Sequence, residues 1–192
     1  MKNWGFLTVI ENQRLGLIGG YLVLNNSGRP LEFHCTTPVR ANRAQEILYG
    51  TTLDAFLYGE QIAQILIKRA KVKPYTILTD RPQILTAQEF VEIPICYIDR
   101  VSPESNNQLS IYASEKNDSS RKNQYGIDSI PCFSTFRRSE HNIGRYKLVI
   151  PKLMSHPDSE TVDELKNVSS TIDFLEPFER IRLAIEEAQK AA

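Results

Sequence analysis

Apolar residues in the first third of the chain occur in short runs separated by polar turns. The runs cover residues 6–10, 15–24 and 31–37. Short apolar runs bounded by turn residues are typical of β-strands, so we predict a meander in which residues 21–37 form a hairpin around Asn25–Gly28. Gly16, Gly19 and Gly20 interrupt the second run, and glycines within a strand indicate a bulge or a close approach of another backbone.

The spacing becomes helical after residue 38. Asn42 and Gln45 have the spacing of a capping box, which predicts a short helix beginning at that point. Thr51 is predicted to cap a longer helix over residues 51–70. Its apolar positions fall on one side, as expected for a helix that lies across a sheet: Leu53, Phe56, Leu57, Ile62, Ile65 and Leu66.

The rest of the chain alternates between strand-like and polar stretches. Strands are predicted at residues 75–79, at 90–98 and in the region 133–150, and helices at 159–168 and 173–192. Pro94 removes a hydrogen-bond donor, which predicts that strand 90–98 lies at an edge or carries a bulge.

These elements predict an α+β fold. We expect a mostly antiparallel β-sheet of five to seven strands, packed against one long amphipathic helix and a C-terminal helix. Residues 1–101 would form the core meander plus helix, and residues 102–128 a polar insertion or mobile hairpin. Residues 129–192 would supply the remaining strands and the C-terminal helix of the same domain.

Composition is that of an ordinary soluble protein. The chain has 192 residues, of which 41% are hydrophobic and 24% are charged, and no apolar run approaches the ~20 residues that span a bilayer. A cytoplasmic location without membrane contact is therefore expected. Basic and acidic residues balance at 23 each, but residues 121–147 are mainly basic and residues 156–192 mainly acidic. This separation of basic and acidic residues along the chain indicates an interaction surface, or two parts of one fold that attract each other.

The basic stretch mixes cations with aromatic rings and supplies the first candidate surface. Its residues are Phe136, Arg137, Arg138, Arg145, Tyr146 and Lys147. The mixture suits phosphate contacts and base stacking in single-stranded nucleic acid. It suits equally well an acidic partner protein, the acidic C-terminal helices of this chain, or a solvated basic face.

A second group of candidates lies at the end of the predicted hairpin and just beyond it: His34, Cys35, Arg40 and Arg43. A thiolate nucleophile at Cys35 would need a base, and neighbouring residues on a strand point to opposite faces, so His34 is poorly placed for that role. The cysteines and histidines lack the paired short spacing of metal sites, so neither a metal nor a cofactor is predicted.

Two further features receive structural interpretations. Asp80 ends a predicted strand, where α/β enzymes often place functional groups, but Arg81-Pro82 follows it, and aspartate commonly begins a turn. The glycines at 16, 19 and 20 do not form a phosphate loop, because such a loop joins a strand to a helix, whereas these lie between two predicted strands.

Three hypotheses for function follow. The first is a non-catalytic protein-interaction module that acts as a subunit or adaptor of a larger intracellular assembly, with a protein partner or further copies of itself. The alternative is a nucleic-acid-binding accessory protein that uses the basic-aromatic segment 133–147. The third is a cysteine-dependent enzyme at Cys35.

Overall fold

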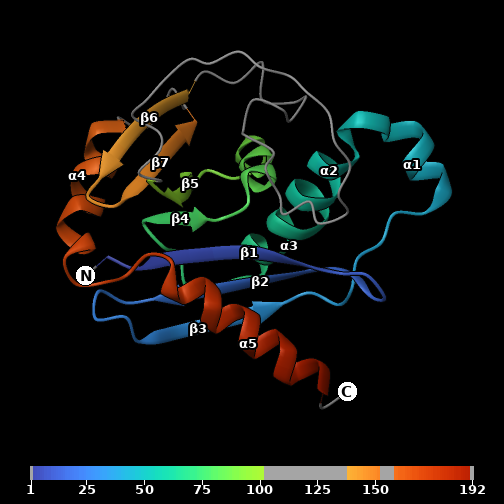
Figure 1. The fold of residues 1–192 in the computed structure, drawn as a ribbon, viewed down its shortest axis with the longest axis horizontal. Coiled ribbons are helices and arrows are strands. Elements are labelled where there is room, and N and C mark those ends of the chain that lie inside the picture. Colours follow the sequence, from blue (N-terminus) through green and yellow to red (C-terminus); the bar gives the residue numbers. More distant parts are fainter. Residues whose placement is uncertain (1, 102–137, 152–157, 191–192) are drawn as a thin grey trace, which may run out of the picture.

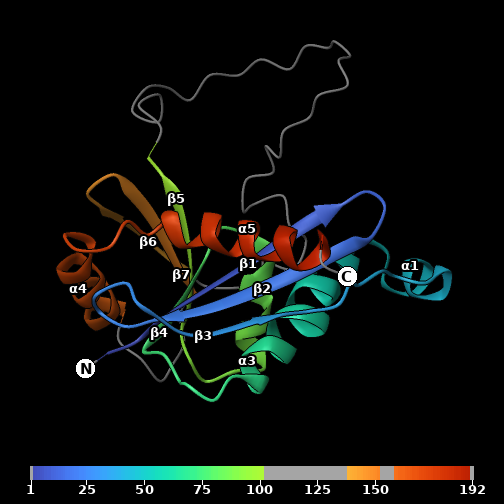
Figure 2. The same ribbon diagram turned by 90° about the horizontal axis from the view of Figure 1, so that it is seen from below.

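A seven-stranded sheet with helices on both faces forms the body of the protein (Figures 1 and 2). The computed structural model describes residues 2–101, 138–151 and 158–190. The strands are β1 (Trp4–Asn12), β2 (Gly16–Leu24), β3 (Pro30–Cys35), β4 (Thr76–Thr79), β5 (Ile95–Arg100), β6 (Arg138–Ile143) and β7 (Tyr146–Pro151). Their order across the sheet is β3-β2-β1-β4-β5-β7-β6, and only the β1–β4 and β4–β5 pairings are parallel. The predicted α+β fold with a mostly antiparallel sheet is confirmed.

The helices divide between the two faces of the sheet. One face carries α1 (Arg43–Tyr49), η1 (Gly50–Thr52), α2 (Leu53–Ala55), η2 (Phe56–Gln64), α3 (Ile65–Arg69) and the 3₁₀ helix η3 (Pro82–Glu89). The other face carries α4 (Asp158–Ser169) and α5 (Glu176–Lys190). Two separate apolar cores result, one on each side of the sheet, which is why β1 is buried along most of its length.

Two glycines in β2 allow a helix to pack closely on each face. A Cβ added at Gly19 would lie 2.1 Å from Cγ2 of Ile62 in η2, and one at Gly20 would lie 2.2 Å from Cγ2 of Ile181 in α5. Real Cβ atoms do not approach neighbours so closely, and the atoms that block them belong to buried side chains. The glycines therefore mark a close approach, but of helix side chains rather than of another backbone or a bulge as predicted.

The long helix differs from its prediction at its start and in its middle. The capping box of Asn42 and Gln45 is present. Thr51 does not cap a helix as predicted, because it lies within the 3₁₀ turn η1 that joins α1 directly to α2. In the same turn the Thr52 hydroxyl donates to the carbonyl of Tyr49. Residues of η2 form a π-helical stretch. Gly59 lies in this stretch and faces the Thr86 hydroxyl of η3, which would lie 2.2 Å from a Cβ at that position.

The prediction for residues 90–98 is wrong in two respects. The strand begins only at Ile95, and β5 lies inside the sheet between β4 and β7 rather than at an edge. The buried side chain of Gln88 explains the late start: its amide donates to the carbonyls of Val91 and Ile93, and its oxygen accepts from the N–H of Ile95. The Gln88 side chain thus supplies these backbone groups with the hydrogen bonds that a neighbouring β-strand would otherwise provide.

The second half agrees with the predicted elements within a few residues. The clearest predicted strand corresponds to β7, and the two predicted helices correspond to α4 and α5. The predicted polar insertion, residues 102–128, lies outside the described residues. Within the described ranges, no helix combines the length and apolar character needed to cross a membrane.

Candidate functional site

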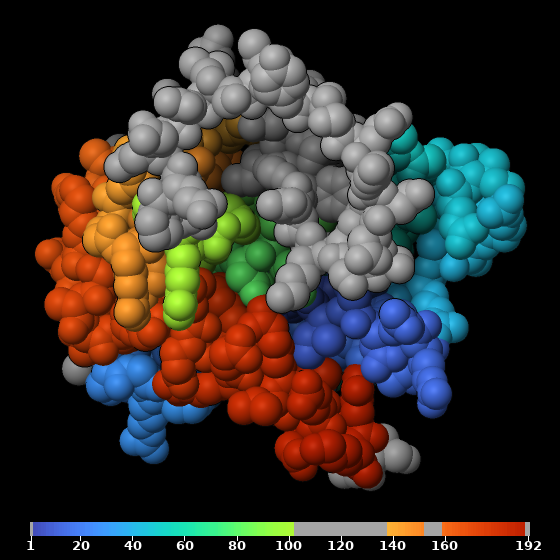
Figure 3. All heavy atoms as spheres, viewed as in Figure 1, coloured from blue at the N-terminus to red at the C-terminus, as the bar shows by residue number. Residues whose placement is uncertain are grey.

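The parallel strands create one edge of the sheet where their carboxyl ends meet. In open α/β sheets, ligands bind in the crevice outside such ends. A cleft of about 640 Å³ lies there, between the ends of β4 and β5 and the first turns of α5. In Figure 3 the green atoms of the β4–η3 region lie between the yellow-green end of β5, the red α5 and the blue β1. The residues lining the cleft are Asp80, Arg81, Tyr97, Ile98, Asp99, Arg100, Asp173, Leu175, Glu176, Phe178, Glu179 and Arg182.

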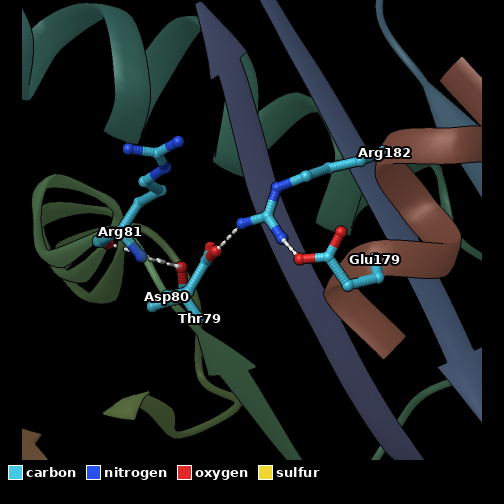
Figure 4. A network of polar contacts seen from close by, with 5 residues as sticks. All are labelled: Thr79, Asp80, Arg81, Glu179 and Arg182. Carbon is cyan, nitrogen blue, oxygen red and sulfur yellow. Dashed lines mark hydrogen bonds and ion pairs between the residues drawn. The ribbon is translucent and has the colours of Figure 1, made fainter. Parts of the chain in front are cut away.

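An ion-pair network ties α5 to the end of β4 at the floor of the cleft (Figure 4). Arg182 donates through Nη2 to Oδ2 of Asp80 and through Nη1 to Oε1 of Glu179, the latter at 2.6 Å. The Thr79 hydroxyl accepts from the backbone N–H of Arg81 at 3.1 Å and shapes the turn after β4. Figure 4 shows the Arg81 side chain directed away from Arg182, so the two arginines serve different parts of the site.

Polar atoms without partners are concentrated beside this network. Asp80 Oδ1, Arg81 Nε and Gln83 Oε1 are buried and make no hydrogen bond with the described residues, and all three belong to the residues that follow β4. Thr8 Oγ1 is also buried and has no hydrogen-bond partner among the described residues. Thr8 lies on β1 close to the end of β4, because the preceding residue, Leu7, pairs with Thr79. Buried polar groups without partners are rare and costly. Two others lie elsewhere in the sheet, Tyr21 Oη in β2 and His141 Nε2 in β6, so four of the six such atoms in the described part of the chain are found near the end of β4.

The end of β5 supplies the exposed rim of the cleft. The Tyr97 hydroxyl donates to Oδ2 of Asp99 at 3.1 Å, and the backbone N–H of Arg100 donates to Oδ1 of Asp99 at 2.7 Å. Burial raises the pKa of Tyr97, and the carboxylates of Asp99 and Asp80 raise it further, so this hydroxyl remains protonated and acts as a donor. No described carboxylate lies within 4.0 Å of the guanidinium groups of Arg81 or Arg100.

The described members of the basic-aromatic candidate surface are engaged in contacts within the chain. Arg145 forms an ion pair with Asp173 at 2.7 Å, and the Tyr146 hydroxyl donates to the same carboxylate at 2.8 Å. Burial opposes ionisation of Asp173, but the Leu175 N–H, the Tyr146 hydroxyl and Arg145 together lower its pKa. Tyr146 is buried and packs against a phenylalanine of the loop before α5.

The remaining cations of this surface share one acid. Lys147 lies 2.8 Å from Glu140, and Arg138 lies 4.0 Å from the same residue. Phe136 and Arg137 lie outside the described residues. The candidate cations that the structure describes are therefore each close to a carboxylate, and Arg145 contacts the acidic C-terminal part of the chain.

The candidates on the hairpin rim lie on β3 and near α1 and do not line the cleft. His34 Nε2 lies 2.6 Å from Oε1 of Glu32. The imidazole ring therefore contacts Glu32 and not the exposed thiol of Cys35. Arg43 forms a 3.0 Å ion pair with Glu46 within α1, and Arg40 is exposed after the bridge between β2 and residue 39.

The partner of His34 has a structural role. Glu32 accepts hydrogen bonds from the backbone N–H groups of Val72 and Lys71, which follow α3. These bonds, with that of His34, lower the pKa of Glu32 to about 2. In the described part of the chain, no group of three or more His, Cys, Asp or Glu side chains lies close enough to hold a metal ion.

Sequence reasoning missed most of the cleft. Asp80 had a usable signal, since it ends an apolar strand, but its partner Arg182 lies about a hundred residues away and has no local signature. Asp99 and Arg100 belong to β5 in the structure, but the predicted strand ended at residue 98 and therefore did not include them.

Comparisons with known proteins identify no family. No family model matches the chain, and no curated protein matches it. Among solved structures, it is similar to an endonuclease V of Ciona intestinalis in complex with DNA, at 9% identity and a TM-score of 0.36, over 54% of this chain and 47% of that one. It is also similar to the Argonaute of Marinitoga piezophila in complex with guide RNA and target DNA, at 9% identity and a TM-score of 0.36, over 90% of this chain and 26% of that one. The chain thus spans less than half of either protein, and similarity at this level supports no conclusion about activity.

Proposed function

We propose that this protein is a non-catalytic interaction module, a subunit or adaptor of a larger cytoplasmic assembly, and that its cleft receives a polar polypeptide segment of a partner protein. One observation carries the proposal: the exposed rim of the cleft presents a hydrogen-bond acceptor and a donor side by side. The acceptor is the carboxylate of Asp99, and the donor is the guanidinium of Arg100, which has no described carboxylate within 4.0 Å.

The mixed polarity of these groups favours a polypeptide over a phosphodiester backbone. A peptide backbone presents N–H donors and carbonyl acceptors in alternation, whereas phosphate and sugar-phosphate oxygens chiefly accept. The charges of the lining support the same choice, since five carboxylates and three arginines surround the cleft. A volume of about 640 Å³ lies within the ordinary range of ligand-binding pockets.

The nucleic-acid hypothesis has less support at the segment on which it was based. Arg138, Arg145 and Lys147 each have a carboxylate within 4.0 Å. A phosphate would have to displace that carboxylate, and the lost ion pair would offset part of the attraction.

A peptide selection tests the proposal. The full-length protein is immobilised and used to enrich a phage-displayed library of random heptapeptides, and binding of the enriched peptides is then measured by calorimetry. We expect Asp99→Asn and Arg100→Gln each to weaken binding about tenfold, the usual consequence of losing a hydrogen bond to a charged group.

The matched control is an exposed acid and base outside the cleft. Asp163 and Lys166 form a 3.2 Å pair on α4, and Asp163→Asn and Lys166→Gln should leave peptide binding unchanged. The proposal fails if no peptide is enriched, or if the cleft variants bind as tightly as the original protein. Binding of poly-dT or poly-A that Arg100→Gln abolishes would assign the cleft to nucleic acid instead.

A further inference from the structure

Strand β3 forms one edge of the sheet, and its outer side is unpaired among the described elements. Figure 2 views the molecule from this side and shows β3 uncovered, with α5 and α3 on either side of it. The N–H of Thr36 donates to the carbonyl of Gly19 at 2.9 Å, which establishes which residues point their backbone groups toward β2. Because these directions alternate along a strand, the backbone N–H and carbonyl groups of His34 and Glu32 also point toward β2. The backbone N–H and carbonyl groups of Phe33 and Cys35 therefore point away from the sheet.

The side chains of the same residues form an apolar strip. Glu32 and His34 point to the face that carries α3, since Glu32 bonds the backbone just after that helix. Phe33 and Cys35 therefore lie on the α5 face, and both are exposed, Phe33 by 38%. Leu31, at the register shift, is 44% exposed.

The two edges of the sheet differ in their protection against pairing. Proteins commonly protect edge strands with charged side chains, prolines or covering elements. At the opposite edge, β6 carries Arg138 and Glu140 and contacts α4. In β3, by contrast, the proline and the register shift are confined to its start, and the charged side chain of Glu32 is bound to backbone N–H groups that follow α3.

We infer that two copies of the chain associate through antiparallel pairing of β3 about a twofold axis at Phe33. This strand is complementary to itself in that register. Phe33 faces its own copy and exchanges two backbone hydrogen bonds with it, and Leu31 faces Cys35 of the other copy. Glu32 faces His34 of the other copy, so no like charges oppose each other.

Helix α5 adds to the same interface. Arg180 donates to the carbonyl of Gly28 in the turn between β2 and β3, so this flank of α5 faces the β3 side. Leu183 and Ala184 follow at helical spacing on that flank, and Leu183 is 61% exposed. A twofold axis perpendicular to the sheet places both α5 helices on the same face, so their flanks would meet above the paired strands.

The inference goes beyond the proposed function, because β3 and the cleft share no residues. Analytical ultracentrifugation of the full-length protein over a range of concentrations is the first test, with a reversible monomer–dimer equilibrium expected. Phe33→Lys should raise the dissociation constant at least about tenfold, since a central aromatic residue is lost and two ammonium groups would face each other.

The matched control is Phe90→Lys. Phe90 is 40% exposed, almost as much as Phe33, but lies outside β3, so its replacement should leave the dimer intact. Circular dichroism of both variants confirms that each is folded, and cleft variants such as Asp99→Asn should dimerise normally.

Disulfide trapping tests the register. In a Cys35→Ser background, Phe33→Cys should form a disulfide-linked dimer under mild oxidation, because hydrogen-bonded antiparallel pairs place Cα atoms about 5.5 Å apart. A protein that stays monomeric at all concentrations, or a dimer indifferent to Phe33→Lys, would overturn the inference. A dimer that Phe33→Lys weakens but Phe33→Cys does not trap would overturn the register.

Discussion

Strand β2 and the carboxyl ends of β4 and β5 belong to the same sheet but have opposite surroundings. At Gly19 and Gly20, helices press on both faces so closely that no Cβ fits, and every neighbour is apolar. At the carboxyl edge the packing opens into a cleft, and beside it the buried atoms Asp80 Oδ1 and Arg81 Nε have no hydrogen-bond partner among the described residues. The comparison shows that open space and charged side chains occur together at one edge of the sheet, while the centre of the meander is filled by apolar packing.

The largest effect is expected where the packing is tightest. Gly20→Ala should destabilise the protein by about 3 kcal/mol or more, because its Cβ would meet side-chain atoms of Ile181 and Ile185 at less than 3 Å. Gly144→Ala is the control: it has open space around it but a φ of +58°, so only about 1–2 kcal/mol is expected. Urea denaturation measures both variants, and equal losses would contradict the tight packing of β2.

The next effect tests whether the floor of the cleft also contributes to stability. Arg182→Met should cost about 1–3 kcal/mol, since it leaves the partly buried carboxylate of Asp80 without its ion-pair partner. Lys190→Met removes an exposed ion pair with Glu187 on the same helix and should cost less than about 1 kcal/mol. Thermal denaturation of the two variants decides the point, and a smaller loss for Arg182→Met than for Lys190→Met would show that the network is dispensable for folding.

The edge of the meander should show a pH-dependent effect. The pKa of Glu32 is lowered to about 2 from an ordinary 4.5, so its stabilising contribution is complete above about pH 4.5 and is lost as the pH falls toward 2. Glu32→Gln should cost about 1–3 kcal/mol at pH 7, because hydrogen bonds to a charged group are lost. The difference from the original protein should shrink between pH 5 and pH 2 in urea titrations. A difference that is constant with pH would mean that the charge of Glu32 is irrelevant.

The smallest effect is expected at α1, which has no buried residue. Leu48 is 82% exposed, so Leu48→Ser should change the free energy of unfolding by less than about 0.5 kcal/mol. A larger loss in the same urea assay would show that α1 packs against part of the protein in solution.

Local signals predicted most of the elements. The turn at Asn25–Gly28, the capping box of Asn42 and Gln45 and the apolar stripe of the long helix each depend on residues close in sequence. Each is present in the structure, except that Ile65 of the predicted stripe is 48% exposed. The late start of β5 was missed because the side chain of Gln88 bonds a backbone segment that otherwise reads as a strand.

The candidate site could be predicted only in small part. Asp80 was noticed at the end of a strand, but its interpretation as a turn residue omitted the partner that α5 supplies. Arg145 and Lys147 were noticed as cations, and only the fold shows which carboxylates lie beside them. Ion pairs between distant segments leave no periodic trace in a sequence.

By itself, the sequence determined the α+β class, the meander, the capping of α1 and the need for close packing at Gly19 and Gly20, because turn chemistry, periodicity and the absence of a Cβ act locally. Only the tertiary structure decided that the carboxyl ends of β4 and β5 meet α5 in a polar cleft, and that β3 rather than β6 is the apolar edge. Strand order and helix placement bring together residues as far apart as Asp80 and Arg182, and that juxtaposition depends on packing across the whole chain.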